Sequence, residues 1–283
     1  MTMRRLVHPG PVAAERHHAV ACAAVPVSIR LRAGASVNEA VALGLAERGF
    51  RAGHVSLRDV ALAPIAYVIP APAPDENHVA WYSETHLLET GTVTQAGCTV
   101  GLRDGEPFLH CHGLWRGGGE ARMGHLLPLE ARLARDAVVE GWGIDGAVMV
   151  ARDDPETGFR LFRAEPAEKA GAAGARRAVL ASIRPNRDIG EALAAIAGEH
   201  GLARCEVLGI GSLTGCRFAD GRVVDWHANE ALILDGMVEA GAARLDMAVV
   251  DRDGRIETGR LEAGSNAVSV TFEALLIEAE GTR

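Results

Sequence analysis

The sequence predicts an α+β protein made of two related domains, each with one amphipathic helix and a mostly antiparallel sheet. Three observations predict this fold class: two capped helical segments of one design, a similar order of strands after each of them, and hairpin turns of similar sequence. A helix followed by antiparallel strands is an α+β arrangement. Recurrence of the whole pattern along the chain is typical of an internal repeat.

The first predicted helix spans residues 36–49. Ser36 precedes an apolar run with helical spacing, Glu39 stands three residues later, and Gly49 follows the last helical position. A serine with a glutamate three residues on is a capping box, and a glycine just past the end is a common helix terminator. The segment therefore carries a start signal and a stop signal of its own.

The second predicted helix, residues 188–201, repeats this design. Asp188 takes the capping position, Glu191 follows three residues on, and Gly201 ends the segment. An aspartate caps a helix as a serine does, because its side-chain oxygen accepts a hydrogen bond from a first-turn amide. The glutamate and the final glycine stand at a constant offset from those of the first helix, which indicates a repeat.

The strands that follow each helix correspond as well. Residues 51–63 and residues 203–219 both read as a strand, a turn of small residues and a second strand. Each copy also contains an Arg-Asp-Gly hairpin turn, at 103–105 and at 252–254. We therefore expect the same elements in the same order in both copies.

These patterns place the domain boundaries. Residues 1–24 have no partner in the second copy and are predicted to form an N-terminal extension. The first domain then spans 25–164 and the second spans 178–283. Residues 165–177 are rich in alanine, glycine and charge, which is typical of a linker.

Composition indicates a cytoplasmic protein. No apolar run reaches the roughly 20 residues that a membrane-spanning helix needs, and the start of the chain lacks the apolar stretch of a signal peptide. The cysteines are odd in number, and no pair has the Cys-x-x-Cys spacing. They fit reduced thiols of the cytoplasm. The five are Cys22, Cys98, Cys111, Cys205 and Cys216.

The overall charge disfavours a nucleic-acid partner. The formal net charge is −8, and lysine and arginine are mixed with acidic residues along the chain. Such a chain repels a phosphate backbone at long range. A local basic patch remains compatible with this charge, so DNA binding is disfavoured and stays open as an alternative.

Three histidines of the first copy form the candidate metal site. His110 and His112 are two residues apart in an apolar strand, so both rings project from one face. His125 follows after a turn of three glycines, and a hairpin there would bring it beside the pair. Three imidazoles suit zinc or another divalent metal that prefers nitrogen ligands. A pair of sheet histidines satisfied by hydrogen bonds is the alternative.

The distribution of histidine favours the metal reading. Nine of the eleven histidines fall in the first 125 residues. The aligned positions of the second copy are Leu245, Met247 and Arg260, none of which forms such a site. We therefore expect that the second copy lacks a metal site of this kind.

Further residues of the first copy are candidates for catalysis beside the ion. His54 opens the strand after the first helix, and His86 and Glu89 follow each other in a polar segment. Each is a candidate ligand, acid/base group or partner of a ligand. Solvent-exposed or strand-end side chains are the alternative. Trp81 and Tyr82 could wall a pocket, although packing in a core is the more frequent use of such rings.

Several motifs together resemble the plant and prokaryote conserved domain. They are the capped helix, the segment Gly209-Ile210-Gly211-Ser212-Leu213, the strand Glu230-x-Leu-x-Leu-x-Gly236, and the His-x-His strand with the Gly-His-Leu segment after it. The resemblance covers nearly the whole chain after residue 25, once per copy.

This resemblance implies a twisted, largely antiparallel sheet flanked by helices and assembly into a homotrimer. It also implies a divalent metal bound through the three histidines. In plants the domain accompanies an AT-hook that binds DNA, and this chain has no Arg-Gly-Arg-Pro hook.

Two functions follow as hypotheses. The first is a metal-dependent enzyme of the hydrolase or lyase type, or a binder of a small molecule that requires the metal. The alternative is a DNA-associated regulatory protein of the same domain type without an AT-hook. In either case the second copy can be structural.

Overall fold

The computed structural model describes residues 4–171 and 173–280 of the chain. Within these residues one sheet of 17 strands runs through the molecule, with two small two-stranded sheets and two helices beside it. The large sheet is antiparallel apart from one short parallel contact. The expected α+β class therefore holds in a coarse form, as a mostly antiparallel sheet with little helix.

The first half of the chain, residues 17–145, supplies one helix and eleven strands. They are β1 (His17–Leu31), α1 (Val37–Ala46), β2 (Gly53–Leu57), β3 (Val60–Leu62), β4 (Ile65–Val68), β5 (Pro70–Ala71), β6 (Trp81–Tyr82), β7 (His86–Leu88), β8 (Gly91–Arg103), β9 (Glu106–Gly117), β10 (Glu120–Leu126) and β11 (Ala137–Asp145).

Two connecting strands and the second half, residues 176–278, complete the fold. The connecting strands are β12 (Ala147–Asp153) and β13 (Arg160–Pro166). The second half contains β14 (Arg176–Ile183), α2 (Ile189–Glu199), β15 (Arg204–Thr214), β16 (Cys216–Arg217), β17 (Val223–Val224), β18 (Asn229–Glu239), β19 (Ala242–Val250), β20 (Ile256–Arg260) and β21 (Ala267–Glu278).

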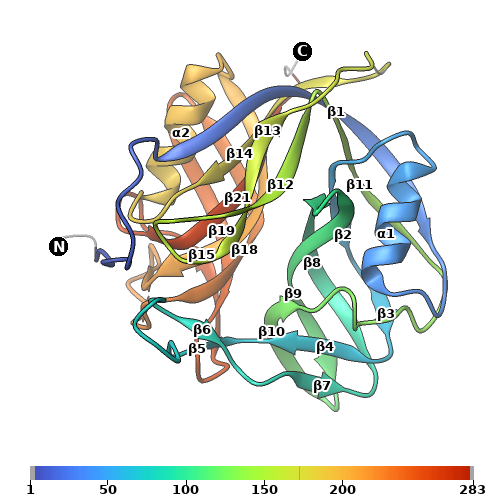
Figure 1. The fold of residues 1–283 in the computed structure, drawn as a ribbon, viewed down its shortest axis with the longest axis horizontal. Helices are drawn as coiled ribbons and strands as arrows, with labels where there is room; N and C mark the ends of the chain where they lie inside the picture. Colours follow the sequence, from blue (N-terminus) through green and yellow to red (C-terminus); the bar gives the residue numbers. More distant parts are fainter. Residues whose placement is uncertain (1–3, 172, 281–283) are drawn as a thin grey trace.

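The two halves pair their strands in the same order. Neighbours run β1-β11-β2-β8-β9-β10 in the first half and β14-β21-β15-β18-β19-β20 in the second. In the chain, α1 follows β1 and α2 follows β14. Figure 1 shows the two halves side by side, with α1 on the right and α2 on the left. The halves therefore share one order of strand pairing, apart from the additional strands β3 to β7 of the first half and β16 and β17 of the second.

Both helices begin as their sequences predict. The Ser36 hydroxyl accepts a hydrogen bond from the Glu39 amide at 3.1 Å, and the Ser36 amide donates to the Glu39 carboxylate at 3.0 Å. Asp188 accepts a hydrogen bond from the Glu191 amide at 2.9 Å. These contacts satisfy amides that the first helical turn leaves without partners. The two predicted caps are confirmed.

Each helix covers one face of its own half-sheet. In the first half, Val41 and Leu45 of α1 pack in a core that includes Cys111 of β9. In the second half, Leu193 of α2 packs in an equivalent core that includes Met247 of β19. Burial of these apolar faces is the main stabilising contribution to each half.

The opposite faces of the two half-sheets pack against each other. One apolar cluster there joins Met123 of β10 to Ile210 and Leu232 of the second half. Another joins Ile144 of β11 to Leu180 of β14, together with residues of β12 and β13. Two sheet faces therefore meet in the middle of the molecule, and polar side chains at this junction lie away from bulk water.

Strand β1 connects the two halves. Residues 17–24 pair with β14, and residues 23–31 pair with β11. The predicted extension, residues 1–24, therefore ends inside a strand of the large sheet. The predicted linker, residues 165–177, begins in β13 and ends in β14. Local composition did not indicate these pairings, because β1 finds one of its partners more than 150 residues away along the chain.

A buried carboxylate fastens residues 4–16 to the second half. Glu156, in the loop between β12 and β13, is 2% exposed. It accepts hydrogen bonds from Arg16 at 2.7 Å and from Arg184 at 3.2 Å. Burial alone raises the pKa of Glu156, but the bonds from Arg16 and from the Ala13 amide outweigh burial and lower the pKa.

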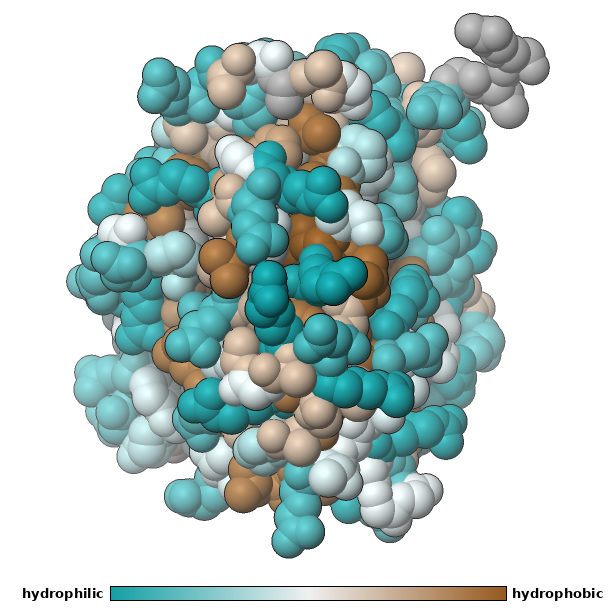
Figure 2. Space-filling model, turned by 90° about the vertical axis from the view of Figure 1, so that its right-hand side faces the viewer, coloured by the Kyte–Doolittle hydropathy of each residue, from teal (hydrophilic) through white to brown (hydrophobic). Residues whose placement is uncertain are grey.

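The outer surface is mainly hydrophilic on the side that carries α1. Figure 2 views this side and shows smaller hydrophobic areas between hydrophilic residues. Leu43 of α1 and Val138 of β11 are among the exposed apolar side chains. Of the helices within residues 4–171 and 173–280, neither has the length and apolar character to cross a membrane.

We predict that Glu156→Gln lowers the free energy of unfolding by about 3 kcal/mol, because it leaves the largely buried Arg16 without its charged partner and removes one of the two carboxylates that pair with Arg184. Urea unfolding followed by circular dichroism measures the change. Glu199→Gln is the control, because the Glu199 side chain is 53% exposed where it meets His17; its expected effect is below about 1 kcal/mol. Equal effects of both substitutions would contradict the structural role given to Glu156.

Candidate metal centre

The antiparallel hairpin of β9 and β10 positions the three histidines. On β9, Leu109 and Cys111 face α1, so the alternate residues His110 and His112 face the second half. His125 of β10 pairs directly with His112 in the strand register. The turn of three glycines therefore brings the third histidine beside the pair, as the spacing predicts.

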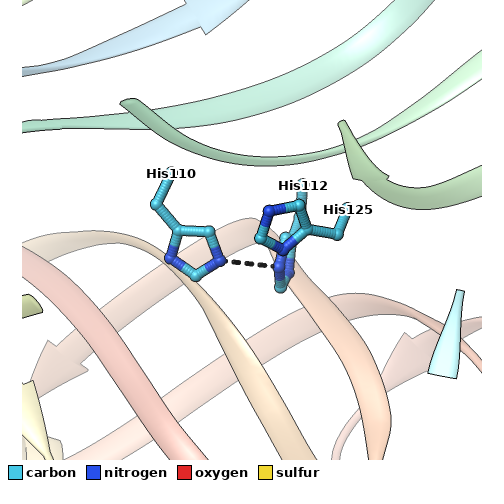
Figure 3. A group of neighbouring side chains, drawn as sticks. All are labelled: His110, His112 and His125. Atoms are coloured by element: carbon cyan, nitrogen blue, oxygen red, sulfur yellow. Dashed lines mark hydrogen bonds between the residues drawn. The ribbon is translucent and has the colours of Figure 1, made fainter. Parts of the chain in front are cut away.

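The rings converge on one point between the half-sheets. The candidate ligand atoms of His110, His112 and His125 all lie within 4.8 Å of one another. Ring centroids are 4.6 Å apart for His110 and His112, and 4.8 Å apart for His110 and His125. Figure 3 shows the rings extending from strands of the first half toward strands of the second.

The second half fixes the orientation of two of these rings. The Nδ1 of His110 donates to a carboxylate oxygen of Glu273 at 2.7 Å. The Nδ1 of His112 donates to the backbone carbonyl of Ala231 at 3.0 Å. Histidines that bind metals commonly use one ring nitrogen in this way, which leaves the other free to act as the ligand. Both Nε2 atoms therefore point to the common centre.

The free nitrogens form an arrangement that needs a positive charge. The Nε2 atoms of His110 and His112 lie 2.9 Å apart, and a carboxylate oxygen of Glu230 lies 3.0 Å from the His112 Nε2. The Nδ1 of His125 is buried and finds no hydrogen-bond partner in the part of the chain that the structure describes. Several lone pairs directed at one point repel each other unless a proton or a cation lies among them.

Burial and charge shift the pKa values of this cluster in different directions. Burial lowers the pKa of His112 and of His125 well below the ordinary value, and the charge of His110 lowers both further. Burial also opposes protonation of His110, but the carboxylate of Glu273 outweighs it and raises the pKa. Burial raises the pKa of Glu230 to about 7, against the opposing charge of His110. Only neutral imidazoles bind metals, so His112 and His125 are held in the binding form, whereas an ion competes with a proton for His110.

Glu230 and Glu273 are site residues that the sequence analysis did not assign. Glu230 is 8% exposed and Glu273 is 2% exposed. Glu230 directly precedes an apolar run in β18, and Glu273 lies between the buried residues Phe272 and Ala274 of β21. A carboxylate in the middle of a buried strand is rarely fully buried without a partner. That exception to the apolar pattern was the available signal.

A cavity opens beside the histidines. Its volume is about 560 Å³, within the range of small-molecule sites. The three histidines, Glu230 and Glu273 lie on its wall, with Trp81 and Tyr82 from β6.

Tyr82 lies on the cavity wall beside the metal centre. Its ring centroid is 5.3 Å from that of His125, and 39% of the residue remains exposed. Burial raises the pKa of Tyr82, and the charges of Glu230 and Glu273 raise it further. The phenol therefore keeps its proton and can donate a hydrogen bond to a molecule in the cavity.

The other predicted catalytic residues lie elsewhere. His54 is buried in β2 and shares a cross-strand row with His110, but β8 lies between the two strands. His86 and Glu89 are exposed, and His86 stacks on Tyr67 with ring centroids 5.1 Å apart. None of the three lines the cavity that contains the histidine cluster.

The structure also corrects the alignment of the two halves. The hairpin turns of β8–β9 and β18–β19 correspond, and counting from them places Asp246 and Ala248 opposite His110 and His112. The strand pairing of Ala248 then places Thr258 opposite His125. The alignment to Leu245, Met247 and Arg260 was therefore wrong; in particular, Leu245 and Met247 belong to the core with α2. The conclusion that no three-histidine set occurs there remains the same.

Solved structures resemble about half of the chain. A metal-containing protein from Archaeoglobus fulgidus is 23% identical, over 49% of this chain and 92% of its own length, with a TM-score of 0.38. A plant- and prokaryote-conserved protein from Pyrococcus horikoshii is 15% identical, over 51% of this chain and 94% of its own, with a TM-score of 0.38.

A candidate DNA-binding protein from Ralstonia eutropha is 13% identical, over 48% of this chain and 88% of its own, with a TM-score of 0.35. No protein-family profile matches the chain, and neither does any curated protein sequence.

We predict that His54 makes stability depend on pH in the metal-free protein. Burial lowers its pKa to about 4 from the ordinary value of 6.5. The unfolded state therefore takes up this proton first, and stability falls as the pH falls from 6.5 toward 4. The full contribution is about 3 kcal/mol. Urea unfolding of His54→Leu at several pH values, with a chelator present, should show a shallower decline than the wild type. If the stability of the variant and of the wild type declined in parallel, the assignment to His54 would be refuted. The control is His200→Leu at the end of α2, which should decline as the wild type does.

Proposed function

We propose that this chain is a metal-binding protein of the plant and prokaryote conserved type, with zinc as the preferred metal, which binds or converts a small molecule. His110, His112 and His125 hold the metal. The single observation that carries the proposal is the pair of Nε2 atoms 2.9 Å apart, whose rings are oriented by hydrogen bonds from their other nitrogens. Without a proton or cation between them, these two lone pairs repel each other.

The residues present fit a divalent ion. Three imidazole nitrogens are the ligand set of known zinc sites that keep a position open for substrate. The buried Nδ1 of His125 has no hydrogen-bond partner among the described residues, so a bond to a cation would satisfy it. Glu273 and the Ala231 carbonyl supply the outer contacts that orient two ligands.

When bound, a divalent ion supplies Lewis acidity toward a carbonyl group or a water molecule, which is the basis for a hydrolase or lyase type of reaction. The residues of the chain then have separate roles. Glu230 can accept a proton at its Oε2, which lies 3.0 Å from His112. Tyr82 can donate a hydrogen bond from the cavity wall. The two packed half-sheets keep bulk water from the buried side of the cluster.

We propose further that the two halves are tandem copies of one domain, the first with the metal ligands and the second without them. The common order of strand pairing supports this proposal. The second copy then has a role beyond stability, because Glu230, Glu273 and the Ala231 carbonyl belong to it.

Association into a homotrimer is also proposed, and it rests on the family resemblance. The apolar side chains of β21 are buried on both faces within one chain, because Phe272 packs in one core and Leu275 in another. Light scattering after gel filtration should give three times the chain mass of 29.8 kDa. A mass of one chain at micromolar concentration would reject the proposal.

We predict that zinc stabilises the wild-type protein and that His112→Ala abolishes this effect. An ion that binds only the folded state adds about 2.7 kcal/mol at a concentration of 100 times its Kd. Thermal unfolding with zinc and with a chelator measures the difference, and elemental analysis gives the stoichiometry. His200→Ala should keep the zinc effect. Wild-type protein that contains no stoichiometric metal and ignores chelators would refute the metal site.

A second substitution tests the contribution of the second half. Glu273→Gln keeps the size of the side chain but removes the charge that faces the His110 Nδ1. We expect zinc affinity to fall about 10-fold to 100-fold, the usual effect of losing an outer carboxylate. Competition with a zinc-sensitive dye measures the affinity. Glu239→Gln, on the exposed end of β18, is the control; an equal affinity in the two variants would contradict the role of Glu273.

A further inference from the structure

The cavity extends away from the histidines along one face of β9. His112, His110 and Phe108 alternate on this strand, so their side chains lie on the same face, roughly 7 Å apart from one to the next. The histidines and Phe108 all line the cavity. One end of the cavity is therefore polar and lies at the metal centre, and the wall becomes apolar beyond it.

Aromatic rings form the middle of the cavity. Phe108 meets Phe162 edge to face, with ring centroids 6.1 Å apart. Trp81 stacks on Phe159 at 5.3 Å. All four rings line the cavity, and such walls favour a flat apolar or aromatic body.

Two arginines line the far end, and only one is paired. Arg160 forms an ion pair with Asp104. The guanidinium of Arg103 lies 5.1 Å from the centroid of Phe108, and it forms no ion pair with any residue that the structure describes. Arg103 is therefore a guanidinium to which no described carboxylate is bonded, beside an Asp104 that Arg160 already binds, and it lies on the order of 10 Å from the histidines when the two spacings are added.

We propose that the cavity binds an organic monocarboxylate with an aromatic or similarly flat apolar body. Its carboxylate pairs with Arg103, its body lies against the aromatic wall, and its other end reaches the metal centre. This inference rests on the proposed function and names its substrate class. A guanidinium group can donate two parallel hydrogen bonds to one carboxylate, which makes this pair both strong and specific.

A single carboxylate fits this end better than a polyanion. Only Arg103 is free of a carboxylate partner, and the acidic side chain of Glu130 also lines the cavity. A second or third negative charge on the ligand would meet Glu130 without a matching cation. The chain as a whole carries a formal net charge of −8, which also disfavours polyanions.

Isothermal titration of the zinc-loaded full chain tests the proposal. The probes are benzoate, 3-phenylpropionate and 4-hydroxycinnamate, each compared with its own neutral amide. We expect at least one acid to bind at least 10-fold more tightly than its amide. Acetate, which has the charge without the body, should bind more weakly than all three.

Two variants test whether Arg103 is the residue that binds the carboxylate of the ligand. Arg103→Gln should remove the preference for the acid and leave zinc binding unchanged. The matched control is Arg135→Gln, because Arg135 is exposed and lies outside the cavity; it should keep the preference. Equal binding of acid and amide, a preference that survives Arg103→Gln, or no binding of any acid overturns the inference.

These outcomes are distinct from failure of the proposed function. A wild-type chain that takes up no zinc refutes the metal site itself. A chain that takes up zinc but shows no preference for the acids refutes only the substrate class.

Discussion

The packing of the two half-sheets face to face is the constraint on which the site depends. An ionised carboxylate is costly to bury without a partner, and this packing buries Glu230 and Glu273 in the middle of the molecule. Both carboxylates meet histidines of the opposite sheet. Glu273 orients the His110 ring, and the carbonyl of Ala231, next to Glu230, orients the His112 ring. The packing that buries the two carboxylates therefore also builds the metal centre.

Short-range patterns predicted the parts of this arrangement that depend on neighbouring residues. The helix caps at Ser36 and Asp188 and the hairpin that joins His112 to His125 depend on spacings of a few residues, and all are present. The carboxylates come from strands more than 100 residues away from the histidines. No local spacing connects them, and only the tertiary packing shows that they meet.

Local patterns also could not predict the strand register of the second half or the pairing of β1 with β14. In a strand, a shift of one residue moves every side chain to the opposite face, and the alignment of the second copy was shifted in this way at Leu245 and Met247. Irregular pairing in β18 adds a residue between Ile233 and Asp235, which makes such a shift easy to miss from sequence. The pairing of β1 with β14 likewise depends on which strand edge is free in the folded chain.

The facing sheets belong to one polypeptide, and this has a consequence for how such a site can change. In an interface between identical subunits, every substitution appears on both sides. Here Ala248 and Thr258 occupy the positions that correspond to His112 and His125, while their own sheet supplies Glu273. A covalent connection removes the symmetry requirement, so one face can specialise in ligands and the other in the groups that orient them.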